Sequence, residues 1–74
     1  MKVTFKNLGH ANKTFTTKIK EVSYDELYRV AKPYLMSREI EFYYDAENKK
    51  GTVVVGIVRN VGEFEVEENE NERN

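Results

Sequence analysis

The sequence predicts a small α+β domain in which one helix packs on one face of a mostly antiparallel five-stranded sheet. Four short segments alternate apolar with polar residues, as strands of a sheet with one solvated face do. A fifth strand-like segment is apolar on both faces. Between the strands, one segment has apolar residues at helical spacing behind a capping motif. The order is therefore ββαβββ, which is typical of a two-layer fold.

Residues 2–8 and 13–20 are predicted to form the first two strands. Valine and phenylalanine alternate with lysine and threonine in the first, and phenylalanine, threonine and isoleucine do so in the second. Residues 9–12 lie between them and include glycine and asparagine, which tolerate positive φ. The pattern predicts a β-hairpin with a four-residue loop.

A helix is predicted to begin at the capping box of residues 23–26. There we expect the Ser23 hydroxyl to accept from the Glu26 amide and the Glu26 carboxylate to reach back to Ser23. One apolar stripe follows at helical spacing, formed by Tyr24, Leu27, Tyr28, Ala31, Tyr34 and Leu35. Pro33 lacks an N–H group and disfavours helical angles at the preceding residue. The helix either kinks there or ends near Lys32, and the continuing stripe favours a kink.

The second half of the chain is predicted to form a three-stranded meander. Residues 40–45 alternate, residues 46–51 form a turn, and the apolar run 52–58 pairs back as the next strand. Residues 60–62, Asn-Val-Gly, have the composition of another turn. Residues 63–67 then alternate again and form the last strand.

A crossover through the helix makes the second and third strands parallel. The first strand, antiparallel to both, then lies between the second strand and the meander, so spatial orders 2-1-5-4-3 and 2-1-3-4-5 both fit. In the first order Glu63, Glu65 and Glu67 lie beside the lysines of the first strand, and in the second Glu41 and Asp45 do. Opposite charges contribute about 0.2–1 kcal/mol per cross-strand pair, which is too little to choose between them.

Length and composition indicate one domain, residues 1–67, followed by a disordered acidic tail, residues 68–74, without aromatic residues. A chain of 74 residues without cysteine is near the lower size limit for folding without disulfides or metals. No secretory signal and no apolar stretch of membrane-spanning length is visible, so we expect a cytoplasmic protein with no membrane association.

Charge is distributed unevenly although the net charge is only −1. Residues 1–38 hold eight basic and three acidic residues, a net charge of +5, whereas residues 39–74 hold four basic and ten acidic, a net charge of −6. Such a split fits a basic binding face with an acidic tail, or two halves of one sheet that attract each other. We favour the second interpretation.

Enzymatic motifs are nearly absent from the sequence. His10 is the only histidine and lies in a predicted loop with no acidic neighbour in sequence, which is typical of a surface residue rather than a general base. Ser23 belongs to the cap, Ser37 lies at a helix end, and neither has a nucleophile-elbow context. There is no glycine-rich phosphate loop and no metal-ligand motif. We expect a non-enzymatic protein without cofactor, metal or small-molecule ligand.

Protein interaction is the function that we expect first, through the open sheet face or a free strand edge. If the helix covers one face, Tyr43, Val54, Gly56 and Val58 form a strip on the other. Tyrosine beside small apolar groups, rimmed by charge, has the composition of an interface core. The competing interpretation is that the two valines pack on each other and on lysine stems. The partner would be another protein or a second copy of the chain.

Weak nucleic-acid binding is the alternative function. Lys2, Lys6, Lys18 and Lys20 are predicted to project from the open face of the first hairpin, and a basic sheet face can follow phosphates. Stacking platforms also need aromatic residues on that face, whereas the phenylalanines of this hairpin point to the core side. Acidic strands in the same sheet would also repel a nucleic-acid backbone, so we rank this function second.

Overall fold

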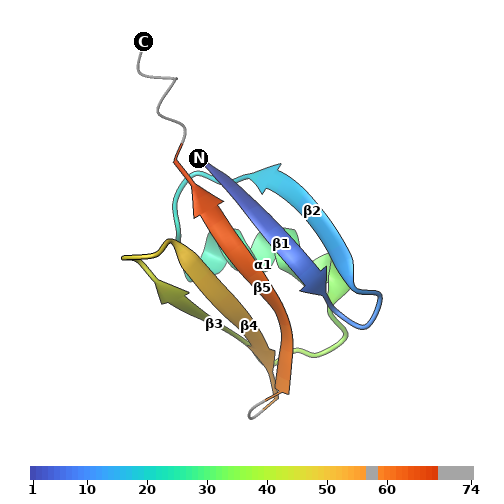
Figure 1. Ribbon diagram of the computed structural model, residues 1–74. Coiled ribbons are helices and arrows are strands. Elements are labelled where there is room, and N and C mark those ends of the chain that lie inside the picture. Colours follow the sequence, from blue (N-terminus) through green and yellow to red (C-terminus); the bar gives the residue numbers. More distant parts are fainter. Residues whose placement is uncertain (57–58, 69–74) are drawn as a thin grey trace.

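The computed structural model describes residues 1–56 and 59–68 of the chain. Its described part forms one five-stranded antiparallel sheet in the order β2-β1-β5-β4-β3, with one α-helix, which confirms the predicted α+β fold (Figure 1). Of the two strand orders compatible with the sequence, the chain adopts the first. The elements are β1 (Lys2–Leu8), β2 (Lys13–Lys18), α1 (Tyr24–Ala31), a 3-10 helix η1 (Lys32–Tyr34), β3 (Ile40–Asp45), β4 (Lys50–Val55) and β5 (Arg59–Glu67).

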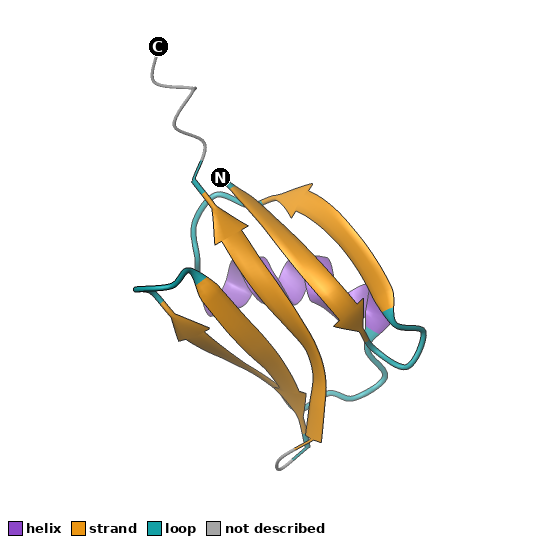
Figure 2. Cartoon of the chain, viewed as in Figure 1, coloured by secondary structure: helices purple, strands orange, loops and turns teal. Residues whose placement is uncertain are grey.

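Helix α1 crosses one face of the sheet and leaves the other face open, with β2 and β3 as the two outer strands (Figure 2). The core lies between α1 and the sheet. Its buried side chains are Val3, Phe5, Leu8, Ile19, Leu27, Ala31, Leu35, Ile40, Val53, Phe64 and Val66. The Phe5 and Phe64 ring centroids lie 5.6 Å apart, in contact across the neighbouring strands β1 and β5. The alternation of the sequence therefore predicted correctly which side chains face the helix.

Opposite charges face each other between β1 and β5. Lys2 lies opposite Glu67, Thr4 opposite Glu65 and Lys6 opposite Glu63, and the Lys6 Nζ also pairs diagonally with the Glu65 Oε2 at 2.9 Å. This register is the one that the 2-1-5-4-3 order implies. The uneven charge of the two halves is thus partly neutralised within the sheet.

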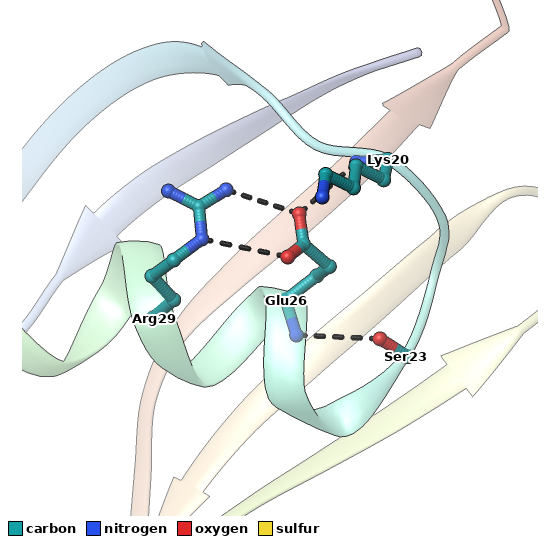
Figure 3. Close-up of polar contacts among 4 residues, drawn as sticks. All are labelled: Lys20, Ser23, Glu26 and Arg29. Carbon is teal, nitrogen blue, oxygen red and sulfur yellow. Dashed lines mark hydrogen bonds and ion pairs between the residues drawn. The ribbon is translucent and has the colours of Figure 1, made fainter.

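The start of α1 confirms one half of the predicted capping box (Figure 3). The Ser23 Oγ accepts a hydrogen bond from the Glu26 N–H at 3.3 Å, as predicted. The Glu26 carboxylate does not return to Ser23. It accepts from the Lys20 N–H at 3.0 Å and from the Arg29 guanidinium, whose Nη2 lies 3.0 Å from Oε1. A second backbone donor and a cation one turn away compete successfully for this carboxylate.

The predicted kink at Pro33 is wrong. The α-helix ends at Ala31, and residues 32–34 continue as a turn of 3-10 helix in which the Leu35 N–H donates to the Lys32 carbonyl at 3.0 Å. The tighter turn needs no N–H from Pro33, so the proline fits at its start without bending a longer helix. Leu35 nevertheless remains buried, which is why the apolar stripe continued past the proline.

The connection between β4 and β5 differs from the prediction. We expected a strand over residues 52–58 and a turn at residues 60–62, but β4 ends at Val55 and β5 already begins at Arg59. Gly56 has φ 65° and begins the turn, a conformation that glycine adopts without strain. The Asn60 side chain accepts from the Gly62 N–H at 2.9 Å beside a shift in the strand register. Turn-forming residues here build an irregularity inside a strand.

Candidate functional site

The sequence-predicted strip on the open face does not form a continuous exposed surface. Tyr43 on β3 is 60% exposed, but Val54 on β4 is only 9% exposed because it lies between the longer side chains of Glu41 and Asn60 on the neighbouring strands. Gly56 lies in the turn after β4 rather than in a strand. Val58 lies outside the described residues. Within the described residues, Val54 is therefore largely covered by its own chain.

The four lysines of the alternative function are only partly brought together. Lys2 and Lys18 lie directly opposite each other on β1 and β2. Lys6 is engaged by Glu65 at 2.9 Å. Lys20 follows the end of β2, and its backbone N–H is bound by Glu26. Lys6 is thus paired with a carboxylate, and the other three lysines lie at or beyond the open end of the hairpin rather than in one row along the sheet face.

The outer edge of β3 brings together features that the sequence did not single out as a site. Hydrogen-bonded and non-hydrogen-bonded residues alternate along an antiparallel pair. The Gly56 N–H donates to the Glu39 carbonyl at 3.0 Å, so Glu39 is a hydrogen-bonded residue of the pair that this segment forms with β4. Every second residue shares this orientation, so the backbone groups of Glu41 and Tyr43 also point to β4. The backbone N–H and C=O groups of Phe42 and Tyr44 accordingly point away from the sheet.

A hydrogen bond from Tyr24 confirms that every second residue of β3, beginning with Ile40, turns its backbone groups away from β4. The Tyr24 hydroxyl donates to the Ile40 carbonyl at 2.7 Å, so this carbonyl is turned away from β4 and is capped by the first residue of α1. The Tyr24 ring meets the Phe42 ring edge-on at 5.4 Å and stacks near Tyr28 at 5.7 Å, yet 47% of Tyr24 is exposed. The free part of the edge therefore begins at Phe42 and has a tyrosine on the helix side.

An aromatic side chain also stands on the open side of this edge. Tyr43 projects there, while Tyr44 lies on the helix side and stacks on the Phe64 ring at 6.0 Å. Tyrosine is enriched at protein interfaces because it combines a large apolar ring with a polar end. The edge of β3 is thus bordered by partly exposed tyrosines on both faces of the sheet.

The surroundings of the edge are acidic. Glu41 is exposed on the open face and Asp25 is exposed on α1, and within residues 1–56 and 59–68 neither forms an ion pair. Partial burial raises the pKa of the Tyr24 phenol, and the negative charges of Glu41 and Asp25 add to this rise. Hydrogen bonds from Asn48 lower the pKa of Asp45, at the end of the strand, so this carboxylate is held in its charged form.

An open depression of about 580 Å³ lies at the end of the sheet where the first hairpin loop, the segment after η1 and the start of β5 meet. Leu35 and Val61 contribute apolar lining, and His10 and Arg59 contribute polar lining. No hydrogen bond joins His10 to a carboxylate in the described part of the chain, so the geometry supplies no oriented acid–base pair.

Two further findings concern metals and membranes. Among the described residues, no three histidine or carboxylate side chains are placed so that they could hold a metal ion. None of the described helices is long and apolar enough to cross a bilayer.

Comparison with known proteins gives no match to a family model, to a curated protein or to a solved structure.

Proposed function

We propose that this chain is a non-enzymatic, cytoplasmic protein-interaction module that binds an extended segment of a partner protein along the outer edge of β3. The observation that carries the proposal is the edge itself. Phe42 and Tyr44 direct N–H and C=O groups outward, and exposed tyrosines stand on both sides. A peptide that adds a strand to such an edge gains main-chain hydrogen bonds, while alternate side chains contact the two faces.

The other outer strand, β2, is less suited to this role. The Ile19 N–H donates to the Met1 carbonyl at 3.1 Å, so Ile19 and every second residue before it turn their backbone groups to β1. The residues between them, Thr16 and Lys18, therefore direct their backbone groups outward. No partly exposed aromatic side chain stands on the open face there, and Phe15 on the other face is covered by Tyr34 at 4.7 Å. Aromatic anchors contribute most of the binding energy at interfaces, so β3 is the better edge.

A proline scan of the two edges tests the proposal. A library of displayed peptides that alternate apolar and polar residues would be selected on the immobilised protein and then tested on Tyr44→Pro. Proline at an outward position removes a free N–H without breaking the ladder to β4, so we expect binding to fall at least about tenfold. Tyr44→Val controls for the lost ring, and Thr16→Pro is the matched change on β2.

Folding of each variant would be checked by amide NMR spectra. Unchanged binding by a folded Tyr44→Pro variant would refute the β3 edge as the docking site. Loss of binding in Thr16→Pro with retention in Tyr44→Pro would assign the site to β2 instead. Failure to select any peptide that depends on either edge would refute the interaction module.

Nucleic-acid binding is the second candidate, favoured by one observation. Lys2 and Lys18 lie opposite each other at the open end of the first hairpin, where like charges destabilise a sheet, and a bound phosphate group would relieve this repulsion. Fluorescence anisotropy with single-stranded and duplex oligonucleotides at low salt would show affinity that falls in a Lys2→Ala, Lys18→Ala variant. Equal affinity of the variant, or no binding at low salt, would exclude this function.

A further inference from the structure

The chemistry of the segment that binds β3 follows from the two faces of this strand, and this inference rests on the proposed function. Side chains that lie opposite each other on neighbouring strands share a face of the sheet. On the open face, an incoming strand would therefore lie beside Glu41, Tyr43 and Asp45. On the helix side it would lie beside Phe42 and Tyr44, next to the exposed part of Tyr24.

The open side of the edge favours positive charge. Glu41 has no ion-pair partner in the part of the chain that the structure describes. Its neighbour on β4 is Val54 rather than a cation. Tyr43 presents a ring that is 60% exposed, over which an ammonium or guanidinium group can lie. Asp45 faces Lys50, so its charge is partly compensated within the sheet.

The helix side of the edge favours apolar groups. Phe42 and Tyr44 are half-buried and pack against the core, with the Phe42 and Phe64 rings 6.2 Å apart. The Tyr24 hydroxyl is occupied by the Ile40 carbonyl, so the accessible part of Tyr24 is its ring. An apolar side chain of the incoming strand would extend this aromatic layer and remove its exposed portion from water.

A second copy of the chain is a poor occupant because a two-fold pairing of β3 with itself brings carboxylates together. Centred on Phe42, such a pair sets Glu39 opposite Asp45, and centred on Tyr43 it sets Glu41 opposite Asp45. Centred on Tyr44, it opposes Glu41 and Glu47. Every arrangement carries a repulsive pair.

Pairing of β3 with the lysine-rich β2 of another copy avoids this repulsion. Because β2 and β3 are different surfaces of the chain, however, the contact is heterologous and gives a ring or an open polymer rather than a two-fold dimer. The acidic side chains on β3 thus disfavour two-fold self-pairing and favour a different, positively charged chain at this edge.

We infer that the partner segment is an extended peptide in which lysine or arginine alternates with apolar residues, its basic side chains beside Glu41, Tyr43 and Asp45 and its apolar side chains beside Tyr44 and Tyr24. The Tyr24 hydroxyl on the Ile40 carbonyl ends the free edge, so main-chain pairing starts at Phe42 and runs toward the end of β3.

Three synthetic peptides of equal length test the inference, each alternating valine with lysine, threonine or glutamate. Titrations followed by amide NMR should show the lysine peptide binding about five- to tenfold more tightly than the threonine peptide at low ionic strength. This advantage should shrink as salt is added. Glu41→Gln should reduce it, whereas Glu63→Gln, a matched change on the central strand β5, should leave it unchanged.

The outcomes separate the inference from the function on which it rests. Equal binding of the lysine and threonine peptides, lost in Tyr44→Pro, would overturn the inference while leaving the β3 edge as the docking site. No binding of any of the three peptides would overturn the inference directly. Sedimentation that shows polymers dependent on Tyr44 would make a second copy the occupant and would equally overturn it.

Discussion

Substitution of Gly51 by alanine tests the packing that supports the β3 edge. Gly51 lies on β4 between Tyr44 of β3 and Phe64 of β5, and the Phe64 ring covers it. A Cβ atom at this position would lie 2.2 Å from the Phe64 Cζ and 2.5 Å from the backbone oxygen of Tyr43. Phe64 is completely buried and its ring packs against the rings of Phe5, Phe42 and Tyr44, so a displacement of the ring would disturb the core.

The sign of the effect distinguishes this packing from ordinary strand propensity. Glycine inside a strand is destabilising by about 0.5–1 kcal/mol relative to alanine, so Gly51→Ala would stabilise the protein if the site were open. Overpacking of a filled site costs typically about 1–3 kcal/mol. We therefore expect a lower free energy of unfolding. In a domain of this size each kcal/mol corresponds to a fall of about 4–8 °C in the melting temperature.

Urea and thermal unfolding of four proteins measure this effect: the parent chain, Gly51→Ala, Phe64→Leu and the double variant. Leucine at position 64 leaves room for the new methyl group, so the two changes should cost less together than the sum of the single changes. The contact with the Tyr43 carbonyl remains, so recovery should be partial. A Gly51→Ala variant as stable as the parent chain, or more stable, would refute the packing described here.

Further predictions concern the start of α1. Ser23→Ala should lower the free energy of unfolding by about 1 kcal/mol while Ser23→Asp preserves it; equal losses measured by urea unfolding would contradict the cap. The hydrogen bond from Arg29 lowers the pKa of Glu26 below its unfolded value. The resulting stability is present above the unfolded pKa of about 4.3 and is lost as pH falls through the folded pKa. Glu26→Gln should thus flatten the acid side of the stability–pH curve. An unchanged slope would contradict the lowered pKa of Glu26 in the folded chain. Tyr24→Phe should cost about 0.5–1.5 kcal/mol through the lost bond to the Ile40 carbonyl, and an unchanged unfolding midpoint would contradict that bond.

Residue alternation was sufficient to predict which side chains form the core. Val3 and Phe5 in β1, and Phe64 and Val66 in β5, all face α1 as the two-residue period requires. The loop of residues 9–12 and the serine cap were also predictable, because glycine, asparagine and serine satisfy specific backbone requirements there.

The connection after β4 was not predictable because the same residue types serve two structural purposes. Asn60 and Gly62 suit a turn and equally suit a bulged strand, and Gly56 suits a bulge and equally suits a turn. Only the pairing of β5 with both neighbours decides between these uses. The burial of Val54 depends in the same way on the lengths of its cross-strand neighbours, which sequence periodicity does not specify.

The position of the candidate site depends on strand order, which the sequence left open. In the order 2-1-3-4-5 the strand of residues 40–45 would be central and the last strand would be at the edge. The observed order makes β3 an outer strand instead. Tyr43 could be identified as an outward residue from parity alone. The contribution of Tyr24 was missed because its place in the apolar stripe indicated a core position.

Amide hydrogen exchange at β3 tests the central claim most directly. In the free protein, the Phe42 and Tyr44 amides should exchange rapidly, whereas the Glu41 and Tyr43 amides, which face β4, should be protected. Saturation with the alternating lysine–valine peptide should slow exchange at Phe42 and Tyr44. Protection of these two amides in the free chain, or continued rapid exchange when the peptide is bound, would contradict strand addition at this edge.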